Sequence, residues 1–187
     1  MDKIMSEVCV FLADGFEEIE GLTVVDILRR AGIDISMISI NGKKKVTGAH
    51  GIALDTDEDI VQCDLDKLDM LVLPGGMPGT TNLAACEKLT EALKKADQEK
   101  RGIAAICAAP SVLGDLGFLK GKKAVCYPGF ESRLTGAEVL AVPVVTDGHI
   151  TTSRGMGTAI AFALELTKRL KDEETAKQVG RSIIYNV

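Results

Sequence analysis

The sequence predicts one α/β domain, spanning residues 1–187, with a doubly wound and mostly parallel sheet sandwiched by helices. Strand-like and helix-like segments alternate along the chain, which is typical of this class. Residues 70–73 and 103–106 are short apolar runs without polar alternation, as expected of parallel strands covered on both faces. Gly32 and Gly102 follow helix-like segments, at positions where glycine commonly caps a helix.

The individual elements follow from apolar periodicity and from turn residues. We expect strands at residues 7–13, 34–40, 69–73, 103–106, 124–126 and 143–147, and helices at residues 17–31, 86–100, 110–116, 155–170 and 172–180. Residues 46–60 should form a small hairpin or edge ribbon, and Asp147-Gly148 is a strong hairpin signal. Ligand sites of such sheets gather at the carboxyl ends of strands, so residues 13–18, 74–76 and 107 should converge there.

The charge balance argues against a nucleic-acid partner, and the short apolar runs argue against a membrane span. The chain has 22 basic and 27 acidic residues, a net charge of −5, which disfavours an extended nucleic-acid surface. The longest basic run, residues 43–45, follows Asn41-Gly42 and is interpreted as a solvated turn. The apolar run at residues 8–12 is too short to span a bilayer and lacks a signal-peptide layout. We therefore expect a cytoplasmic protein.

The five cysteines are scattered through the chain and include no Cys-x-x-Cys pair. The two histidines lack the spacing of zinc ligands. We therefore expect no disulfide framework, no metal and no other cofactor. Four of the cysteines are interpreted as packing residues: Cys9, Cys63, Cys86 and Cys126. His149, directly after Asp147-Gly148, is expected to be a surface residue of a turn or strand.

The remaining cysteine, Cys107, lies in the most informative segment, residues 101–111. Its apolar strand ends on Cys107, and Pro110 suits the first turn of a helix. A sharp strand-to-helix turn presents a nucleophile beside backbone N–H groups and the positive end of a helix. Those groups are expected to lower the pKa of the thiol. Ala108 follows directly, so a Cys–His relay has no local support.

The first expected helix carries a carboxylate where an apolar residue is expected. At about 100° per residue, Glu20 shares the apolar stripe with Phe16, Val24, Ile27 and Ala31. Glu18 is expected on the opposite side, near Arg29. Glu20 could hydrogen-bond backbone at the start of the helix. Alternatively, and preferably, it faces the site with a pKa raised by desolvation and donates a hydrogen bond to the Cys107 thiolate.

Several motifs in this order resemble the superfamily of ThiJ, PfpI and the Parkinsonism-associated protein deglycase (DJ-one). They are Phe11-Leu-Ala-Asp-Gly-Phe-Glu-Glu-Ile-Glu20, Val25-Asp-Ile-Leu-Arg-Arg-Ala-Gly32, Leu73-Pro-Gly-Gly76, Ala104-Ala-Ile-Cys-Ala-Ala-Pro110 and Thr152-Ser-Arg-Gly-Met-Gly-Thr158. The resemblance spans nearly the whole chain, on its ThiJ-like deglycase branch. It implies a flavodoxin-like sandwich and a homodimer.

The resemblance also implies roles for residues of the three converging loops. Cys107 would be the nucleophile and Glu20 the carboxylic acid paired with its thiol. The backbone N–H groups of Gly75, Gly76 and Ala108 would form an oxyanion-type site.

Two further residues take possible accessory roles from the resemblance. Arg29 would lie near the dimer interface, and His50 would approach the site of the partner subunit. Tyr127 stands where deglycase-type members often carry a histidine, so it could donate a hydrogen bond but cannot act as an imidazole. Ala108 stands where the protease branch has histidine, which disfavours protease activity. Met156 replaces a frequent proline and is expected only to alter loop stiffness.

Two functions remain open. The first is a cysteine-dependent enzyme that acts without glutathione on small dicarbonyls such as methylglyoxal, yielding lactate, or on early glycation adducts. The alternative is an oxidative-stress sensor or redox-regulated chaperone that works through oxidation of Cys107. A purely structural or partner-binding domain would not account for Glu20 on an apolar stripe.

Overall fold

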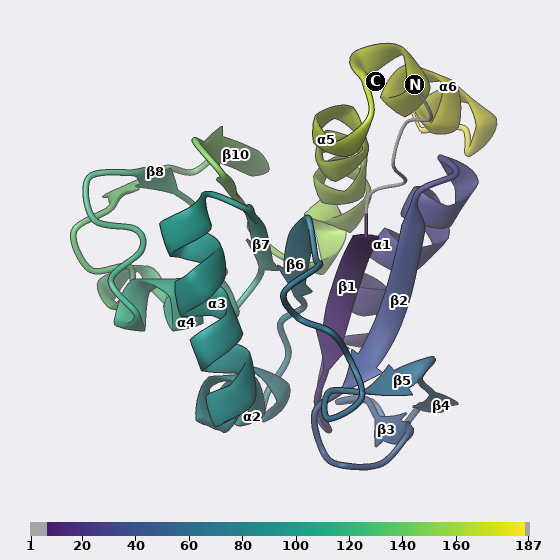
Figure 1. Cartoon of the computed structure of the whole chain (residues 1–187). Coiled ribbons are helices and arrows are strands. Elements are labelled where there is room, and N and C mark those ends of the chain that lie inside the picture. The colour runs from purple at the N-terminus through teal and green to yellow at the C-terminus, as the bar shows by residue number, and fades with distance from the viewer. Residues whose placement is uncertain (1–6, 186–187) are drawn as a thin grey trace.

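The computed structural model describes residues 7–185, which form one central sheet with helices on both faces (Figure 1). The strand order is β10-β11-β7-β6-β1-β2-β5. The strands are β1 (Glu7–Leu12), β2 (Asp34–Ser39), β5 (Glu58–Asp59), β6 (Met70–Leu73), β7 (Gly102–Ile106), β10 (Val144–Asp147) and β11 (Ile150–Ser153). All neighbouring pairs are parallel except β10 and β11. The predicted doubly wound, flavodoxin-like class is confirmed.

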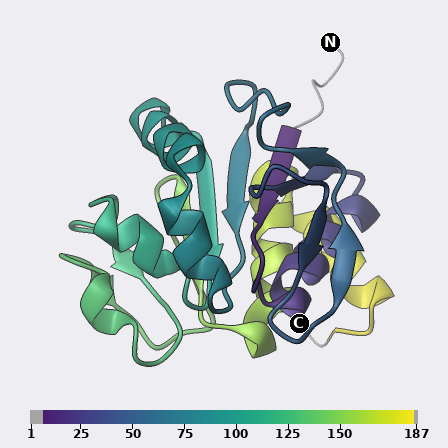
Figure 2. The same cartoon turned by 90° about the horizontal axis from the view of Figure 1, so that it is seen from below.

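The helices form two layers, visible on either side of the sheet in Figures 1 and 2. Their bounds are α1 (Glu18–Arg30), α2 (Gly79–Ala85), α3 (Glu87–Glu99), α4 (Pro110–Asp115), α5 (Ala159–Leu170) and α6 (Glu173–Ser182). Cys9 and Phe11 of β1 pack in the cluster of α2, α3 and α4, whereas Val8 and Val10 pack in that of α1, α5 and α6. Two buried faces explain the unbroken apolar runs of the parallel strands.

The chain order places one edge of the sheet as the expected ligand site. From β1 the chain continues to β2 on one side, and from β6 it continues to β7 on the other. Strand order therefore reverses between the adjacent strands β1 and β6. Parallel α/β sheets bind ligands at such a reversal, outside the carboxyl ends of the strands.

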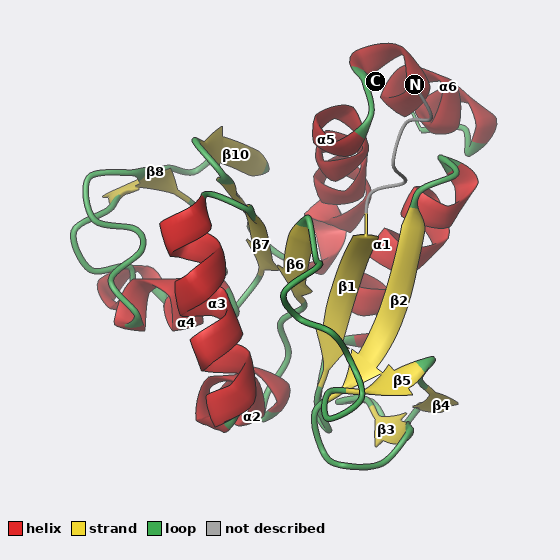
Figure 3. Ribbon diagram, in the orientation of Figure 1, coloured by secondary structure: helices red, strands yellow, loops and turns green. Residues whose placement is uncertain are grey.

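Two small sheets lie outside the central one (Figure 3). The antiparallel pair β3 (Lys45–Thr47) and β4 (Ala53–Asp55) confirms a ribbon in the first part of the range expected, residues 46–60. Residues 58–59 join the central sheet instead, as β5. The strand expected at residues 124–126 is shorter, β8 (Lys123–Ala124), and pairs with β9 (Glu138–Val139) rather than joining the central sheet. The sequence analysis assigned this strand no partner, because apolar content does not identify one. Two 3-10 turns, η1 (Glu131–Arg133) and η2 (Met156–Thr158), complete the elements.

The predicted helix ends are right at Gly32 and wrong at Gly102. Gly32 closes α1 with φ of 66° and donates to the Arg29 carbonyl. Helix α3 instead ends at Lys100, which takes the left-handed conformation with φ of 59°. Gly102 begins β7, where a Cβ atom would come within 2.9 Å of the Met70 methyl group. Helix α2 was not predicted, since its Thr-Thr-Asn segment has low helix propensity.

The described helices do not include a membrane span. Within residues 7–185, no helix combines the length and apolar character needed to cross a bilayer.

Candidate active site

Cys107 occupies the sharp turn between β7 and α4 that the sequence predicted. Its φ of 65° is left-handed, a strained conformation for a residue with a side chain. Its N–H donates to the Ser153 carbonyl at 3.0 Å, and its own carbonyl accepts from Tyr127 N–H at 2.8 Å. These two bonds hold the strained residue from both sides, and its side chain is half-buried.

Glu20 approaches Cys107 from the first turn of α1. The residue is 1% exposed, and its Oε2 atom and the Cys107 Cβ atom lie against the same side of Gly75. Oε2 also accepts from Gly75 N–H at 2.8 Å, while the buried Oε1 has no hydrogen-bond partner. The preferred interpretation of the sequence therefore matches the geometry: the carboxyl on the apolar stripe faces the thiol.

The loop after β6 must carry glycine to let the thiol and carboxyl meet. A Cβ atom on Gly75 would lie 2.6 Å from Cys107 Cβ and 2.8 Å from Glu20 Oε2, closer than real contacts allow. The three expected backbone donors divide into two roles. Gly76 and Ala108 N–H groups lower the pKa of Cys107 and so favour its thiolate, whereas the Gly75 N–H is engaged by Glu20.

The two ionisable groups perturb each other. Burial raises the pKa of Glu20 to about 7, against the opposing hydrogen bonds from Cys107 and Gly75. Burial and the adjacent Glu20 charge raise the pKa of Cys107 to about 12, although Ala108 and Gly76 N–H groups favour the thiolate. The expected lowering of the thiol pKa is therefore wrong, because desolvation and a like charge outweigh the backbone donors. Between these two values the pair shares one proton.

The pair opens into a cleft of about 570 Å³. The cleft is lined by Glu17, Glu20, His50, Gly76, Cys107, Tyr127, Pro128, Arg154, Gly155, Met156, Gly157 and Thr158. Tyr127 is 51% exposed, and its ring would meet a Cβ atom on Gly155 at 3.2 Å. Arg154 provides a cationic side chain at this cleft, which the sequence analysis did not single out.

Glu18 is the clearest correction to the predicted side-chain positions. It was expected on the far side of α1 near Arg29, but it is buried and bonds the β3–β4 hairpin. Its Oε1 accepts from His50 N–H at 2.8 Å and Ile52 N–H at 3.4 Å. Arg29 instead donates to Asp57 at 2.9 Å. A purely helical projection could not anticipate a hairpin returning over the start of α1.

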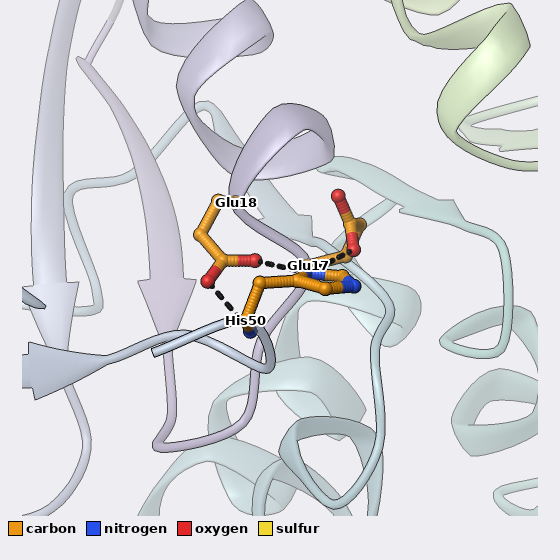
Figure 4. Close-up of side chains that lie close together, drawn as sticks. All are labelled: Glu17, Glu18 and His50. Carbon is orange, nitrogen blue, oxygen red and sulfur yellow. Dashed lines mark hydrogen bonds and ion pairs between the residues drawn. The ribbon is translucent and has the colours of Figure 1, made fainter. Parts of the chain in front are cut away.

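His50 lies at the cleft of its own chain, beside two carboxylates (Figure 4). Its Nδ1 is 2.9 Å from Glu18 Oε2 and 3.3 Å from Glu17 Oε2. The Glu18 hydrogen bond and the nearby Glu17 charge raise the pKa of His50. The ring is 68% exposed, so its remaining nitrogen is available to solvent or a ligand.

Among residues 7–185, the same three residues are the group whose side chains lie close enough together to hold a metal ion. The ligand atoms of Glu17, Glu18 and His50 lie within 4.8 Å of one another. In this structure the Nδ1 atom of the imidazole lies within ion-pair distance of both carboxylates. A metal ion would have to replace the Nδ1 proton, and we assign none.

His149 is not the surface residue that was expected. It is 8% exposed, and its Nε2 is 2.7 Å from Asp97 Oδ1. Burial lowers its pKa, against the opposing effect of the Asp97 hydrogen bond. His149 and Asp97 are absent from the cleft lining, so this histidine has a packing role.

Polar residues of β11 support the elbow from behind and were missed as site residues. Thr152 Oγ1 accepts from Val125 N–H at 3.0 Å. Ser153 Oγ donates to the Pro143 carbonyl at 2.9 Å and lies 2.7 Å from Thr158 Oγ1. The available signal was the polar run Thr151-Thr-Ser153 in a strand that the topology buries.

The match to known families covers most of this fold and the whole site. Residues 6–169 match the model of the DJ-1/PfpI family. The chain belongs to the DJ-1/PfpI family. It is 36% identical to Protein DJ-1 homolog B of Arabidopsis thaliana over 98% of this chain and 42% of that protein. It is 32% identical to a deglycase of Pyrococcus abyssi, covering 88% of this chain and 99% of that one.

A solved family member has nearly the same backbone. The structure of oxidized Toxoplasma gondii DJ-1 superposes with a TM-score of 0.94 at 34% identity, covering 97% of this chain and 100% of that chain. The chain spans less than half the length of the Arabidopsis relatives that it matches. Family membership is therefore shown, and the activity of the chain is a matter for proposal.

Proposed function

We propose that this protein is a cysteine-dependent enzyme that converts reactive dicarbonyls such as methylglyoxal to 2-hydroxy acids without glutathione. The observation that carries the proposal is the buried Glu20 carboxyl beside the Cys107 thiol at one cleft, where each group alters the pKa of the other. A pair that shares one proton supplies a nucleophile and a proton donor in the same arrangement.

The first step transfers the shared proton as the carbon–sulfur bond forms. The Cys107 thiol gives its proton to the Glu20 carboxylate as the sulfur attacks the aldehyde carbon, and the carbonyl oxygen takes that proton from Glu20 to give a hemithioacetal. The Gly76 and Ala108 N–H groups, which favour the Cys107 thiolate, would also stabilise the developing alkoxide.

Glu20 then carries the rearrangement as a carboxylate. It removes the proton from the former aldehyde carbon and passes it to the neighbouring carbonyl oxygen, forming an enediol. It then takes the hydroxyl proton of the sulfur-bearing carbon and returns it to the neighbouring carbon. The product is the thioester of lactate on Cys107, and one water molecule hydrolyses it to lactate and the free thiol. A carboxyl with a pKa of about 7 suits both directions of this transfer near neutral pH.

The same residues suit a second class of dicarbonyl-derived substrate. An early glycation adduct presents a hemiaminal carbon that a thiolate can attack, with the amine leaving after it gains the Glu20 proton. The Pyrococcus abyssi relative is named a deglycase, which supports including adducts in the substrate class. The cleft is open at half-exposed Tyr127, so adducts on larger molecules can approach.

The test is lactate formation from methylglyoxal by the wild type, Cys107→Ala and Glu20→Gln. We expect activity in the wild type and none in the Cys107 and Glu20 variants, measured with D- and L-lactate dehydrogenases. Cys86→Ser is the matched control, because Cys86 is a half-buried free thiol at the junction of α2 and α3. Equal lactate formation by all four proteins would overturn the proposal.

The alternative function, a redox sensor or redox-regulated chaperone, would work through oxidation of Cys107. The half-buried sulfur lies beside two N–H groups and a carboxyl that could bind a sulfinate. The Toxoplasma relative was solved in an oxidized form. Peptide mass spectrometry after graded peroxide should find Cys107 oxidised before Cys126. Equal rates at the two residues would exclude this sensor function.

We also propose a homodimer acting in the cytoplasm. Ile19 is 51% and Leu22 37% exposed on one face of α1, and Ile52 is 56% exposed on the adjoining hairpin. These apolar side chains suit a two-fold contact. Arg29 follows Leu22 by two helical turns and is therefore placed near that contact.

A further inference from the structure

A second pair of reactive side chains lies between β1 and the loop that precedes β6. Cys9 and Cys63 are 54 residues apart in sequence, and their sulfur atoms are 3.9 Å apart. Both are free thiols. The sequence analysis treated each as an isolated packing residue, because the pairing depends on how the loop folds back over β1.

The two thiols share a cavity that is separate from the Cys107 cleft. The cavity has a volume of about 290 Å³ and is bordered by both cysteines. None of its lining residues borders the Cys107 cleft. Cys9 is 4% exposed, whereas Cys63 is half-buried. A small reagent therefore reaches Cys63 first.

The pKa values of the two thiols also favour Cys63 as the one that reacts first. The Cys9 hydrogen bond lowers the pKa of Cys63, and the Lys88 ammonium acts the same way against the effects of burial, Glu58 and Asp64. The bond to Cys63 and burial raise the pKa of Cys9. A partly exposed thiol with a favoured thiolate is the usual site of oxidant attack, and a protonated neighbour suits the resolving role.

We propose that Cys9 and Cys63 form a reversible dithiol–disulfide site that reacts with hydroperoxides. This site is additional to the function proposed for Cys107 and does not depend on it. The geometry that carries the proposal is the sulfur–sulfur distance, together with the cavity that both thiols border.

The reaction has two balanced steps. The Cys63 thiolate attacks one peroxide oxygen, the O–O bond breaks, and the departing oxygen takes a proton to leave as water or an alcohol. The Cys9 sulfur then attacks the Cys63 sulfenic acid, the S–O bond breaks, and the hydroxyl leaves as water with the Cys9 proton. Two thiols are oxidised to one disulfide as one peroxide is reduced.

Forming the Cys9–Cys63 disulfide requires the two sulfur atoms to move closer together, and the loop that carries Cys63 is the part that can move. A disulfide needs sulfur atoms about 2.05 Å apart. Cys9 is fixed in β1 between β2 and β6. Cys63 lies in the loop between β5 and β6, held by its N–H bond to the Asp59 carbonyl at 3.2 Å. Lys88 anchors the start of the loop at the Ile60 carbonyl, so a shift near Cys63 leaves the sheet in place.

The experiment is disulfide mapping of the whole native protein after graded hydrogen peroxide. Remaining thiols are alkylated in an acid quench before digestion and mass spectrometry. We expect a Cys9–Cys63 cross-linked peptide that disappears after dithiothreitol. A mixture of pairings among the five cysteines is expected only from protein oxidised in urea.

Three variants separate the steps. Cys9→Ser should stop at a Cys63 sulfenic acid that dimedone traps, whereas Cys63→Ser should leave Cys9 reduced. Cys86→Ser, the control, should form the cross-link as the wild type does. Circular dichroism verifies that each variant is folded.

Two results would overturn the proposal. One is a native protein in which Cys9 and Cys63 remain free thiols after peroxide treatment, as shown by their full alkylation, although Cys107 has been oxidised. The other is a cross-link that joins Cys9 or Cys63 to a different cysteine or to a second molecule. Loss of lactate formation in Cys107→Ala has no bearing on this outcome, so the two proposals fail independently.

Discussion

Burial of the Glu20 carboxyl raises its pKa into the range useful for proton transfer, but it lowers the stability of the folded protein near neutral pH. Its pKa lies near 7 in the folded protein, against an ordinary value of 4.5. Between these values the folded protein retains a proton that the unfolded chain has lost. Stability is therefore fully present below about pH 4.5 and is lost as pH rises to about 7, by up to about 3 kcal/mol.

The first prediction follows from this loss of stability as the pH rises. Glu20→Gln removes the titration and keeps the size of the side chain, so above about pH 7 it should unfold at a higher temperature than the wild type. The difference should shrink as the pH is lowered toward about 4.5. Thermal unfolding followed by circular dichroism at several pH values measures it. A gap that does not change with pH would contradict the raised pKa.

Activity should have the opposite dependence on the same group. The proton that leaves near pH 7 creates the singly protonated Cys107–Glu20 pair, so kcat/KM for methylglyoxal should rise through about pH 7. Glu20→Gln should lose this step and at least about 10²-fold in rate. A wild-type profile that is flat across this range would show that another group controls the reaction.

The two histidines provide a direct measurement of local electrostatics. His50 should titrate above 6.5, because Glu18 and Glu17 favour its charged form, and His149 should titrate below 6.5, because it is buried. With only two histidines in the chain, a Glu18→Gln variant assigns the NMR signals. It should lower the His50 value and leave His149 unchanged. Identical titrations in both proteins would exclude the Glu18–His50 contact in solution.

Single residues also show what the sequence could and could not predict. Cys107 and Glu20 were identifiable because each violates a local pattern, a thiol at a strand end and a carboxylate on an apolar stripe. Glu18 and His149 were misplaced because their partners, His50 and Asp97, are 32 and 52 residues away. Local periodicity contains no information about such contacts.

At the scale of elements, the site depends on three strand ends brought to one edge of the sheet. The loop after β6 passes so close to the elbow after β7 that a methyl group on Gly75 would overlap Cys107 Cβ. Strand assignments from the apolar runs were enough to predict this convergence. They were not enough to place β8, whose two residues pair outside the central sheet.

Gly75→Ala should therefore separate the thiol from the carboxyl. The new methyl group meets the Cys107 Cβ atom and the Ala108 backbone nitrogen at 3.0 Å or less, so one loop must move. We expect loss of lactate formation and faster alkylation by iodoacetamide, since the Glu20 effect that raises the Cys107 pKa outweighs that of the backbone donors. Gly42→Ala adds the same methyl group in open space and should retain activity. Wild-type activity in Gly75→Ala would show that the two loops need not touch.

For the whole molecule, the apolar surface of α1 and the adjoining hairpin is the feature that a monomer leaves exposed. Ile19 and Leu22 are one helical turn apart on the same face, and Ile52 is tied to the start of α1 through Glu18. This surface adjoins His50, because the His50 N–H bonds the same carboxylate. A second subunit seated there would lie next to the cleft.

The last prediction is that Ile19→Glu converts a dimer to a monomer. A buried carboxylate at an apolar two-fold contact appears twice, once from each subunit, so its effect on association is doubled. Light scattering after size exclusion should give twice the chain mass of 19.9 kDa for the wild type and one chain mass for the variant. Val142→Glu, which changes a residue 41% exposed in another part of the chain, should stay dimeric. A monomeric wild type, or a variant that remains dimeric, would contradict this interface, and lactate formation by the monomer would show that one chain holds a complete site.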